Sequence, residues 1–392
     1  MRGSYSLGVW ISVAFTSASL LAAQGAPTMQ PLRPSQAPPV DVTRARVVEI
    51  LTGDQIADLP TQRTAVAGAC DKACLTGIAD TYFAALVAHD PRKTPMAPNA
   101  KFTEQTKVLA VGEGLWKTAS EAPTTFKVYV ADPVVGQLGA IVTMKDAGKP
   151  IQMGLRLKIV NRQITEAEHL IWTNVNAASM ANLEKPRPGL LETVPPAERL
   201  PRDLMLLYGH GYYDSLEQSD GKAVPFADDC VRHEGGMHTA GPRTDAAPRA
   251  GGARPGGGAA TLQAGAAGQP ADGRGATSAN ASAFGTMTCA GQLDTRFMSY
   301  IERIELRRVW IADEEKGLVF GLSMFRHPMN EKILTLVMPD GTRSQRDMTT
   351  QRTFDMAAVH IFKIRDRKIH EIEATGVVLP FMSPNGWSEF LR

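Results

Sequence analysis

KIVNRQITEAE (residues 158–168) and KIRDRKIHEIE (residues 363–373) carry Lys, Ile, Arg and Glu at the same positions of two segments that lie 205 residues apart. In each segment a pair of turn-forming residues, Asn161-Arg162 or Asp366-Arg367, separates two short strand-like runs. This pattern predicts a tight β-hairpin in each segment. A hairpin that occurs twice also indicates an internal repeat.

Two further pairs of segments match in the same order along the chain. YFAALVAHD (residues 82–90) matches YYDSLEQSD (residues 212–220), and VYVADPVVGQL (128–138) matches VWIADEEKGLV (309–319). The offset between matched residues grows from 130 to 181 and then to 205. We interpret the chain as a duplication in which the second copy contains two insertions.

The two insertions differ in composition. Residues 241–285 are rich in Gly, Ala and Pro and have almost no large apolar side chains, so we expect this tract to be disordered. The second insertion is EKILTLVMPDGTRSQRDMTTQRTF (residues 331–354).

Within each copy, helical periodicity precedes strand patterns. CLTGIADTYFAALVAH (residues 74–89) places apolar side chains on one helical stripe, whereas MAAVHIFKI (356–364) resembles a strand. The sequence therefore predicts an α+β fold. We expect two tandem cone-like domains, residues 68–180 and 195–392, each a curved antiparallel sheet packed with N-terminal helices.

The N-terminus is typical of an exported protein. Residues 1–26 combine an early Arg, a short apolar run and small residues at the end, which predicts a signal peptide, with a membrane anchor as the alternative. Residues 27–67 form a Pro-rich leader. We expect a periplasmic or secreted protein that makes no membrane contact once the signal is removed. The formal charge of +2 does not favour a nucleic-acid partner.

Export favours disulfides for the four cysteines, which are Cys70, Cys74, Cys230 and Cys289. Cys70 and Cys74 can pair only if the backbone between them is not regular helix, and Cys230 and Cys289 would then remain. The sequence alone does not establish this connectivity. A zinc site is the rival interpretation, although the C-x3-C spacing has no partner motif.

The chain resembles tandem SnoaL-like proteins of the nuclear transport factor 2-like superfamily, in particular a secreted bacterial and fungal subgroup of unknown function. The resemblance covers residues 68–175 and 195–383. Its motifs are CDKACL, YFAALVAHDP, FTE and GEGLW in the first copy, and ADDCVRHEGG, CAGQLD, RRVWIADEEKGLV and HP in the second. It implies cones that enclose apolar pockets. The superfamily includes ketosteroid isomerase, scytalone dehydratase, limonene epoxide hydrolase and polyketide cyclases, as well as proteins without catalysis, so fold alone does not give function.

One motif departs from the pattern expected of this subgroup, which is Glu-Asn-Gly after the first strand. Here the stretches are Glu104-Gln105-Thr106 and Glu234-Gly235-Gly236. The offset of 130 aligns Glu104 with Glu234, and strand alternation places each on the same face as the residue two before it, Phe102 or Arg232. A carboxylate beside an aromatic ring in a dry pocket suits a general acid or base, and one beside Arg suits binding.

Glu104 and Glu234, with His233, are therefore the candidate catalytic residues. The alternatives are acids that are exposed, that pair with local basic groups, or that bond to backbone amides at the start of the next helix. Candidate ligand-binding residues are Tyr82, Phe102, Trp116, Tyr212, Arg232, Trp310 and His360. His238 and His327 would join them only if the fold gathered them. Glu166, Glu168, Glu371 and Glu373 alternate along their strands, and we expect a solvated face there.

These observations lead to two expectations about function. The first is cofactor-free acid–base chemistry, of isomerase, dehydratase, lyase or epoxide hydrolase type, on a small apolar and polyketide-like or aromatic molecule. The second is a module that binds a small molecule or has a structural role without catalysis. Neither requires a metal or a cofactor, and the sequence leaves a homodimer open.

Overall fold

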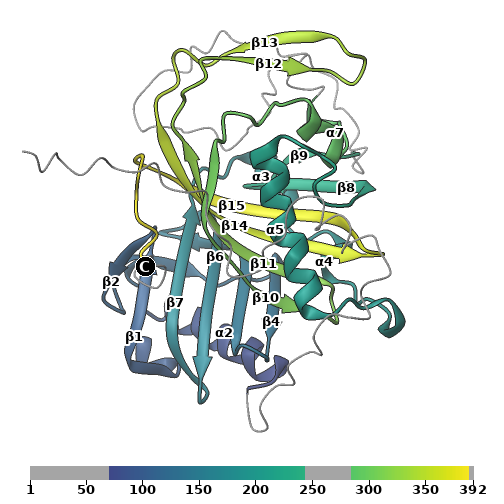
Figure 1. Ribbon diagram of the computed structural model, residues 1–392. Coiled ribbons are helices and arrows are strands. Elements are labelled where there is room, and N and C mark those ends of the chain that lie inside the picture. The colour runs from purple at the N-terminus through teal and green to yellow at the C-terminus, as the bar shows by residue number, and fades with distance from the viewer. Residues whose placement is uncertain (1–69, 243–283, 388–392) are drawn as a thin grey trace, which may run out of the picture. The chain divides into compact units, whose positions relative to one another are not determined.

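Two mixed sheets, both mainly antiparallel, form the framework of the protein. The computed structural model describes residues 70–242 and 284–387. The first sheet has seven strands in the order β2-β1-β7-β6-β5-β3, with β4 also paired to β5, and the second has six in the order β10-β11-β14-β15-β8-β9 (Figure 1). A separate two-stranded sheet joins β12 and β13. The fold is therefore α+β, as predicted.

The elements of the first half are α2 (Lys72–Val87), η2 (Pro91–Lys93), β1 (Met96–Glu104), β2 (Lys107–Leu109), η3 (Gly114–Lys117), β3 (Ala119–Glu121), β4 (Lys127–Asp132), β5 (Gln137–Asp146), β6 (Lys149–Val160) and β7 (Gln163–Trp172). The halves are connected through α3 (Ala177–Leu183), α4 (Pro188–Leu191) and η4 (Pro196–Glu198). The second half contains α5 (Arg202–Gln218), β8 (Phe226–Glu234), β9 (Met237–Ala240), α7 (Cys289–Asp294), β10 (Arg303–Asp313), β11 (Leu318–His327), β12 (Ile333–Val337), β13 (Arg343–Asp347), β14 (Phe354–Arg365) and β15 (Lys368–Leu379).

The two hairpins predicted from the repeated segments are present. β6 pairs with β7 and β14 pairs with β15, both antiparallel. The turn residues have positive φ angles, 51° and 62° at Asn161 and Arg162, and 48° and 58° at Asp366 and Arg367. Two consecutive residues of positive φ are the signature of the type I′ turn, whose twist matches that of the adjoining strands.

The two sheets repeat one strand order. The order β2-β1-β7-β6-β5 in the first sheet corresponds to β9-β8-β15-β14-β11 in the second, and β4 and β10 each pair with the last strand. In both sheets the second and third strands of this order, β1 with β7 and β8 with β15, are parallel. The β12–β13 hairpin lies where the second insertion was predicted. The predicted signal peptide, the predicted leader and almost all of the Gly-rich tract lie outside the described residues.

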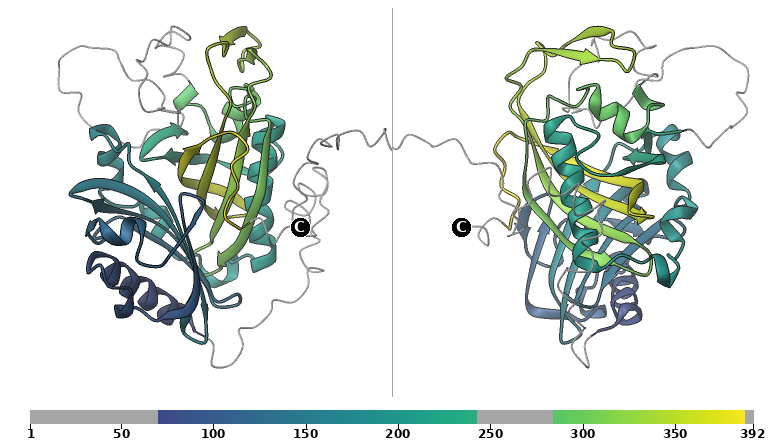
Figure 2. Two further views of the ribbon diagram at one scale, coloured as in Figure 1. Left: turned by 90° about the vertical axis from the view of Figure 1, so that its left-hand side faces the viewer. Right: turned by 45° about the vertical axis from the view of Figure 1, so that its right-hand side comes forward.

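A long helix packs on each sheet and closes a core. α2 lies against the first sheet and α5 against the second (Figure 2). Leu75, Ala79, Tyr82 and Leu86, on the predicted helical stripe, are buried in the first core. Among residues 70–242 and 284–387, no helix is long and apolar enough to cross a membrane.

The four cysteines form two disulfides, Cys70–Cys74 and Cys230–Cys289. Cys70 precedes the N-cap residue Asp71 and so lies outside α2, which allows it to reach Cys74 in the first turn. Cys230 on β8 is joined to the first residue of α7, so this helix is tied to the sheet. The prediction of disulfides is confirmed.

The other faces of the two sheets pack against each other through a third apolar cluster. Its members include Val128, Val130 and Ile141 from the first half, together with Phe320 and Val359 from the second. Two ion pairs at matched positions border this contact. Arg202 Nε lies 2.7 Å from Asp132 Oδ2, and Lys72 pairs with Asp313. Since Lys72 aligns with Arg202 and Asp132 with Asp313, the contact is reciprocal, as in a two-fold dimer.

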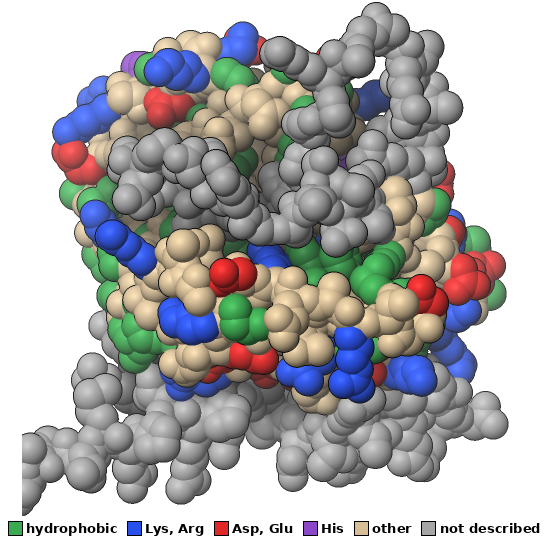
Figure 3. Space-filling model, turned by 90° about the horizontal axis from the view of Figure 1, so that it is seen from above, with side chains coloured by type: hydrophobic (Ala, Val, Ile, Leu, Met, Phe, Trp, Pro, Cys, Tyr) green, Lys and Arg blue, Asp and Glu red, His purple; other side chains and the backbone are tan. Residues whose placement is uncertain are grey.

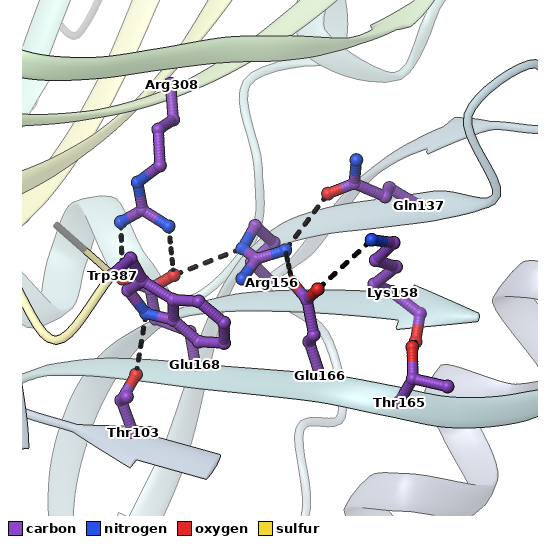
Figure 4. A network of polar contacts seen from close by, with 9 residues as sticks. All are labelled: Thr103, Gln137, Arg156, Lys158, Thr165, Glu166, Glu168, Arg308 and Trp387. Atoms are coloured by element: carbon purple, nitrogen blue, oxygen red, sulfur yellow. Dashed lines mark hydrogen bonds and ion pairs between the residues drawn. The ribbon is translucent and has the colours of Figure 1, made fainter. Parts of the chain in front are cut away.

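The four glutamates expected on a solvated face do not lie on one, so that expectation was wrong: Glu168 and Glu373 are buried, and Glu166 and Glu371 are half-buried. Glu168 is 2% exposed and Glu373 is 1% exposed. Arg308 of β10 donates two hydrogen bonds to the carboxylate of Glu168, at 2.7 and 2.6 Å, and Arg156 Nε donates a third at 3.1 Å (Figure 4). The other half of the chain covers this face, and each buried charge has an opposite charge beside it.

The C-terminal segment completes this network. The indole of Trp387 lies 4.5 Å over the guanidinium of Arg156, and its Nε1–H donates to Thr103 Oγ1 at 3.0 Å (Figure 4). The end of the second half therefore packs on β1 of the first.

We predict that Glu168→Ala lowers the free energy of unfolding by about 3–5 kcal/mol, because it leaves the buried guanidinium of Arg308 without its counter-ion and leaves Arg156 with only Glu166. Urea denaturation measures this loss. The matched control is Glu121→Ala, which removes an exposed ion pair with Lys145 and should cost less than about 1 kcal/mol. Equal losses in the two variants would contradict the role given to Glu168.

A second prediction concerns pH. Burial raises the pKa of Glu373 to about 7, against the opposing charge of Arg187. In the unfolded chain a Glu titrates near 4.3, so the folded state holds this proton more tightly. The contribution of Glu373 to the free energy of unfolding is therefore fully present below about pH 4. As the pH rises from there to pH 7, this contribution falls by up to about 1.4 kcal/mol per pH unit.

Glu373→Gln should remove that part of the pH dependence. The difference in unfolding free energy between the natural protein and the variant, measured in urea between pH 4.5 and 8, should decline as pH rises. A constant difference would mean that Glu373 titrates normally.

Candidate functional site

In the first half, Glu104 forms the end of a buried chain of hydrogen bonds. Its carboxylate accepts from the backbone N–H of Leu115 at 2.9 Å and lies 3.2 Å from Nδ1 of His169. Nε2 of His169 lies 2.8 Å from the hydroxyl of Tyr82. Tyr82 and His169 are fully buried. One of the alternatives left open for Glu104, an acid bonded to an amide at the start of a helix, describes this geometry, because Leu115 belongs to the first turn of η3.

Aromatic rings fill the space around this chain. The ring of Trp116 lies 5.1 Å from that of Tyr82, and the ring of Phe102 lies 4.9 Å from that of His169. Burial raises the pKa of Tyr82 well above its usual value, and the nearby charge of Glu104 adds to this. The polar groups of Tyr82, His169 and Glu104 thus bond to one another and to the backbone.

In the second half the equivalent region contains a cavity of about 30 Å³. This is room for about two water molecules. Its polar lining consists of one carboxyl group, two phenols and two imidazoles, from Glu234, Tyr212, Tyr300, His327 and His360. Its apolar lining comes from Leu216, Met298, Ile301, Phe325, Met356 and Ala374.

One exchange between the copies leaves room beside the carboxylate. Glu104 is in register with His169 across the parallel pair β1–β7, and Glu234 is in register with Ala374 across the equivalent pair β8–β15. The first copy therefore places an imidazole ring, and the second a methyl group, at the same position beside the carboxylate. Ala374 lines the cavity, so the absence of the ring leaves room there.

The carboxyl group of Glu234 is held next to a buried cation. Arg232 Nε lies 3.1 Å from Glu234 Oε1 and donates to Thr239 Oγ1 at 3.0 Å. Another nitrogen of the same guanidinium bonds to Gln292, whereas Nη1 has no hydrogen-bond partner among the described residues. Burial raises the pKa of Glu234, and the charge of Arg232 only partly opposes that rise. The group is therefore easier to protonate than an ordinary carboxylate.

The other polar groups of the cavity are neutral at physiological pH. Burial raises the pKa of Tyr212 to about 12 and also raises that of Tyr300. Burial lowers the pKa of His327 and of His360 to about 3. The cavity therefore offers two protonated phenols and two neutral imidazoles around one carboxyl group, an arrangement that can donate hydrogen bonds to an oxygen atom and exchange a proton.

The remaining predicted residues lie elsewhere. His233 projects from the opposite face of β8, where its ring lies 5.4 Å from that of His238, and burial lowers its pKa to about 2. Trp310 packs on the apolar cluster between the two sheets. Neither lines the cavity with Glu234.

Sequence reasoning missed His169 and Tyr300, and it included His327 only conditionally. The repeat alignment could have marked His169, because Ala374 stands at its matched position. Tyr300 follows the Gly-rich tract, where the first copy has no matched segment, so no pattern indicated it.

A wider groove of about 430 Å³ lies beside β3 and α3. It is lined by apolar residues such as Phe126 and Leu183 and by charged ones such as Glu121 and Lys145. Those two charges are half exposed and pair with each other. The groove lacks the buried ionisable groups that mark an acid–base site.

Comparison with known families adds one finding. Residues 198–376 match a family model described as a domain of unknown function, DUF8021, and the match covers less than half of the chain. Among curated proteins, no sequence matches this one. Every residue that lines the second-half cavity lies within the matched range.

His169→Ala should lower the free energy of unfolding by about 2–4 kcal/mol, because it creates a cavity and removes the imidazole that bonds to both Glu104 and Tyr82. Chemical denaturation measures this change. The control is His370→Ala, which removes a half-buried imidazole that bonds to the exposed Asp229 and to Arg365 O, and should cost about 1 kcal/mol. Similar losses of unfolding free energy in the two variants would show that the hydrogen bonds joining Glu104, His169 and Tyr82 contribute little to stability.

Proposed function

We propose that the second half holds an active site for cofactor-free proton transfer on a small, mainly apolar molecule that carries an oxygen atom. The single observation that carries this proposal is the placement of Glu234, a buried carboxyl group of raised pKa, in one cavity with the phenols of Tyr212 and Tyr300. Active sites often use burial to bring the pKa of a carboxyl group closer to neutral pH.

The three groups have complementary roles in this proposal. Glu234 takes a proton from a carbon atom next to a carbonyl group, or returns one to it. Tyr212 and Tyr300 donate hydrogen bonds to the carbonyl oxygen, on which negative charge develops during the transfer. The neutral rings of His360 and Phe325, which stack with their centroids 5.6 Å apart, form part of the wall that keeps water out.

In this proposal the first half has a structural role. It has the matching glutamate, Glu104, but the ring of His169 fills the position that corresponds to the cavity. Its carboxylate bonds to Leu115 and His169. The resemblance to tandem SnoaL-like cones supports this division, because that superfamily contains catalytic and non-catalytic members. The two disulfides support an exported protein.

A second candidate function is ligand binding without turnover. The observation that favours it is the ion pair between Arg232 and Glu234, since a guanidinium beside a carboxylate favours the charged form, which is better suited to binding. The two functions differ in whether a bound carbonyl compound exchanges its hydrogen atoms.

Hydrogen–deuterium exchange at the carbon next to the carbonyl group of cyclic unsaturated ketones, followed by NMR in D₂O, tests the proposal. The natural protein should accelerate exchange above the buffer rate. Glu234→Gln should lower the rate by about 10²–10⁴-fold, because it removes the group that moves the proton. Glu104→Gln is the matched control and should change the rate little.

Two results would contradict proton transfer. Exchange that persists in Glu234→Gln would remove Glu234 from the chemistry. Ketones that bind, by NMR line broadening, but do not exchange would favour the binding module. Ala374→His, which places in the second copy the ring found in the first, should abolish binding and exchange together in a folded protein.

A further inference from the structure

The cavity around Glu234 is too small for an organic ligand in its present form. Its volume is about 30 Å³, whereas pockets for small molecules typically have a few hundred Å³. One of its walls must therefore move before a ligand can enter.

Most of the cavity wall is built from regular structure. Glu234, His327, Met356, His360 and Ala374 lie on strands that pair within the second sheet. Tyr212 and Leu216 lie on α5. Moving these residues would break the hydrogen-bond ladders or lift the helix from its core.

The exception is the segment from residue 295 to residue 301, which contributes Met298, Tyr300 and Ile301 to the lining. It consists of turns, with local bonds such as Ser299 N–H to Arg296 O and Ile301 N–H to Met298 O. A segment with few long-range backbone bonds opens at a lower free energy than a sheet.

Both ends of this segment are anchored. Upstream, the side chain of Gln292 donates to the carbonyl groups of Thr239 and Phe284, at 2.7 Å each. Downstream, Glu302 N–H donates to Arg326 O at 3.2 Å. A loop with fixed ends and a weakly bonded middle can open as a lid.

The β12–β13 hairpin contacts the segment on the side away from the cavity, at Thr295 and Phe297. Val337 N–H donates to Thr295 O at 3.0 Å, and Arg346 Nη1 donates to Phe297 O at 3.3 Å. The guanidinium of Arg346 also lies 4.6 Å from the ring centre of Phe297 and 5.1 Å from that of Tyr300. Each cation–π contact is favourable.

Apolar contacts join the same two pieces. Leu334, Leu336 and Met348, in and next to the hairpin, are buried in the core cluster that contains Met298 and Ile301. In Figure 1 the hairpin projects beyond the ends of β11 and β14, and in Figure 3, which looks down on this end, hydrophobic side chains are visible in a hollow of the surface.

We infer that residues 295–301 form a lid over the cavity, that the β12–β13 hairpin holds the lid closed, and that Arg346 is a positioning residue for the phenol of Tyr300. This inference deepens the proposed function, because it describes how that site admits its ligand. Tyr300 donates to the ligand oxygen only when the lid is closed, so the hydrogen-bonding set is completed after entry.

The second insertion thereby has a role, because it contains the β12–β13 hairpin. The hairpin has no counterpart in the first copy, where His169 fills the position of Ala374. The second copy therefore contains both the cavity and the hairpin that holds its lid.

The test compares Arg346→Ala, Arg346→Lys and the control Arg343→Ala, whose side chain is exposed on the same strand. Backbone hydrogen exchange by mass spectrometry reports opening of residues 296–301 without requiring turnover. In Arg346→Ala we expect exchange there to be roughly 3- to 30-fold faster, from the loss of the contacts to Phe297 and Tyr300. Arg346→Lys should recover part of the protection, and Arg343→Ala should match the natural protein.

Stopped-flow fluorescence with 2-naphthol, a small planar phenol, measures entry to the cavity. Arg346→Ala should raise the association and dissociation rate constants together, because a looser lid speeds both directions. Tyr300→Phe should leave the association rate unchanged and weaken binding, since it removes the phenol but keeps the ring under Arg346.

Exchange in β14 and β15 is the internal reference for global unfolding. If exchange in β14 and β15 also rises in Arg346→Ala, that variant is destabilised as a whole. The lid is then tested by comparing exchange at 296–301 in Arg346→Lys and Arg343→Ala. Equal exchange at 296–301 in the Arg346 and Arg343 variants, or unchanged naphthol rates, would overturn the lid. Failure of Glu234→Gln to affect proton transfer would contradict the proposed function while leaving these measurements valid.

Discussion

The burial of glutamate side chains between two packed sheets is the constraint on which the rest of this structure depends. Removing Glu168 and Glu373 from water is costly unless each finds opposite charge and donors nearby. Glu168 finds them in Arg308 and Arg156, and Glu373 in Arg187 and Gln152. Since Arg308 and Gln152 each come from the opposite half, neither half satisfies its own buried acid alone, and the two sheets are stabilised as a pair.

The strand order that the two sheets share makes this pairing reciprocal, while the interiors of the two halves differ. The ion pairs Lys72–Asp313 and Arg202–Asp132 use matched residues from both copies. On the helix-covered sides the two halves differ in sequence, and one difference changes the surroundings of the shared glutamate. An imidazole at residue 169 completes a closed chain of hydrogen bonds, whereas a methyl group at residue 374 leaves a cavity beside a glutamate that both copies share.

The same carboxylate therefore meets two environments. Glu104 bonds to an amide and a histidine, which suits a structural acid. Burial raises the pKa of Glu234, which shares a cavity with two phenols. The turn segment that lines this cavity is bonded to the β12–β13 hairpin. Identical residues at equivalent positions can thus take different roles, because the surroundings determine which protonation state is favoured.

The sequence by itself determined the repeated hairpins, the α+β class and the alignment of the two glutamates, because turn chemistry and strand alternation are local properties. Only the tertiary structure decided what covers each face. Alternation put Glu166 and Glu168 on one face but did not reveal that the other half buries it. Likewise, the parallel pairing that brings His169 to Glu104 and Ala374 to Glu234 joins residues far apart in the chain, and no local pattern encodes such a contact.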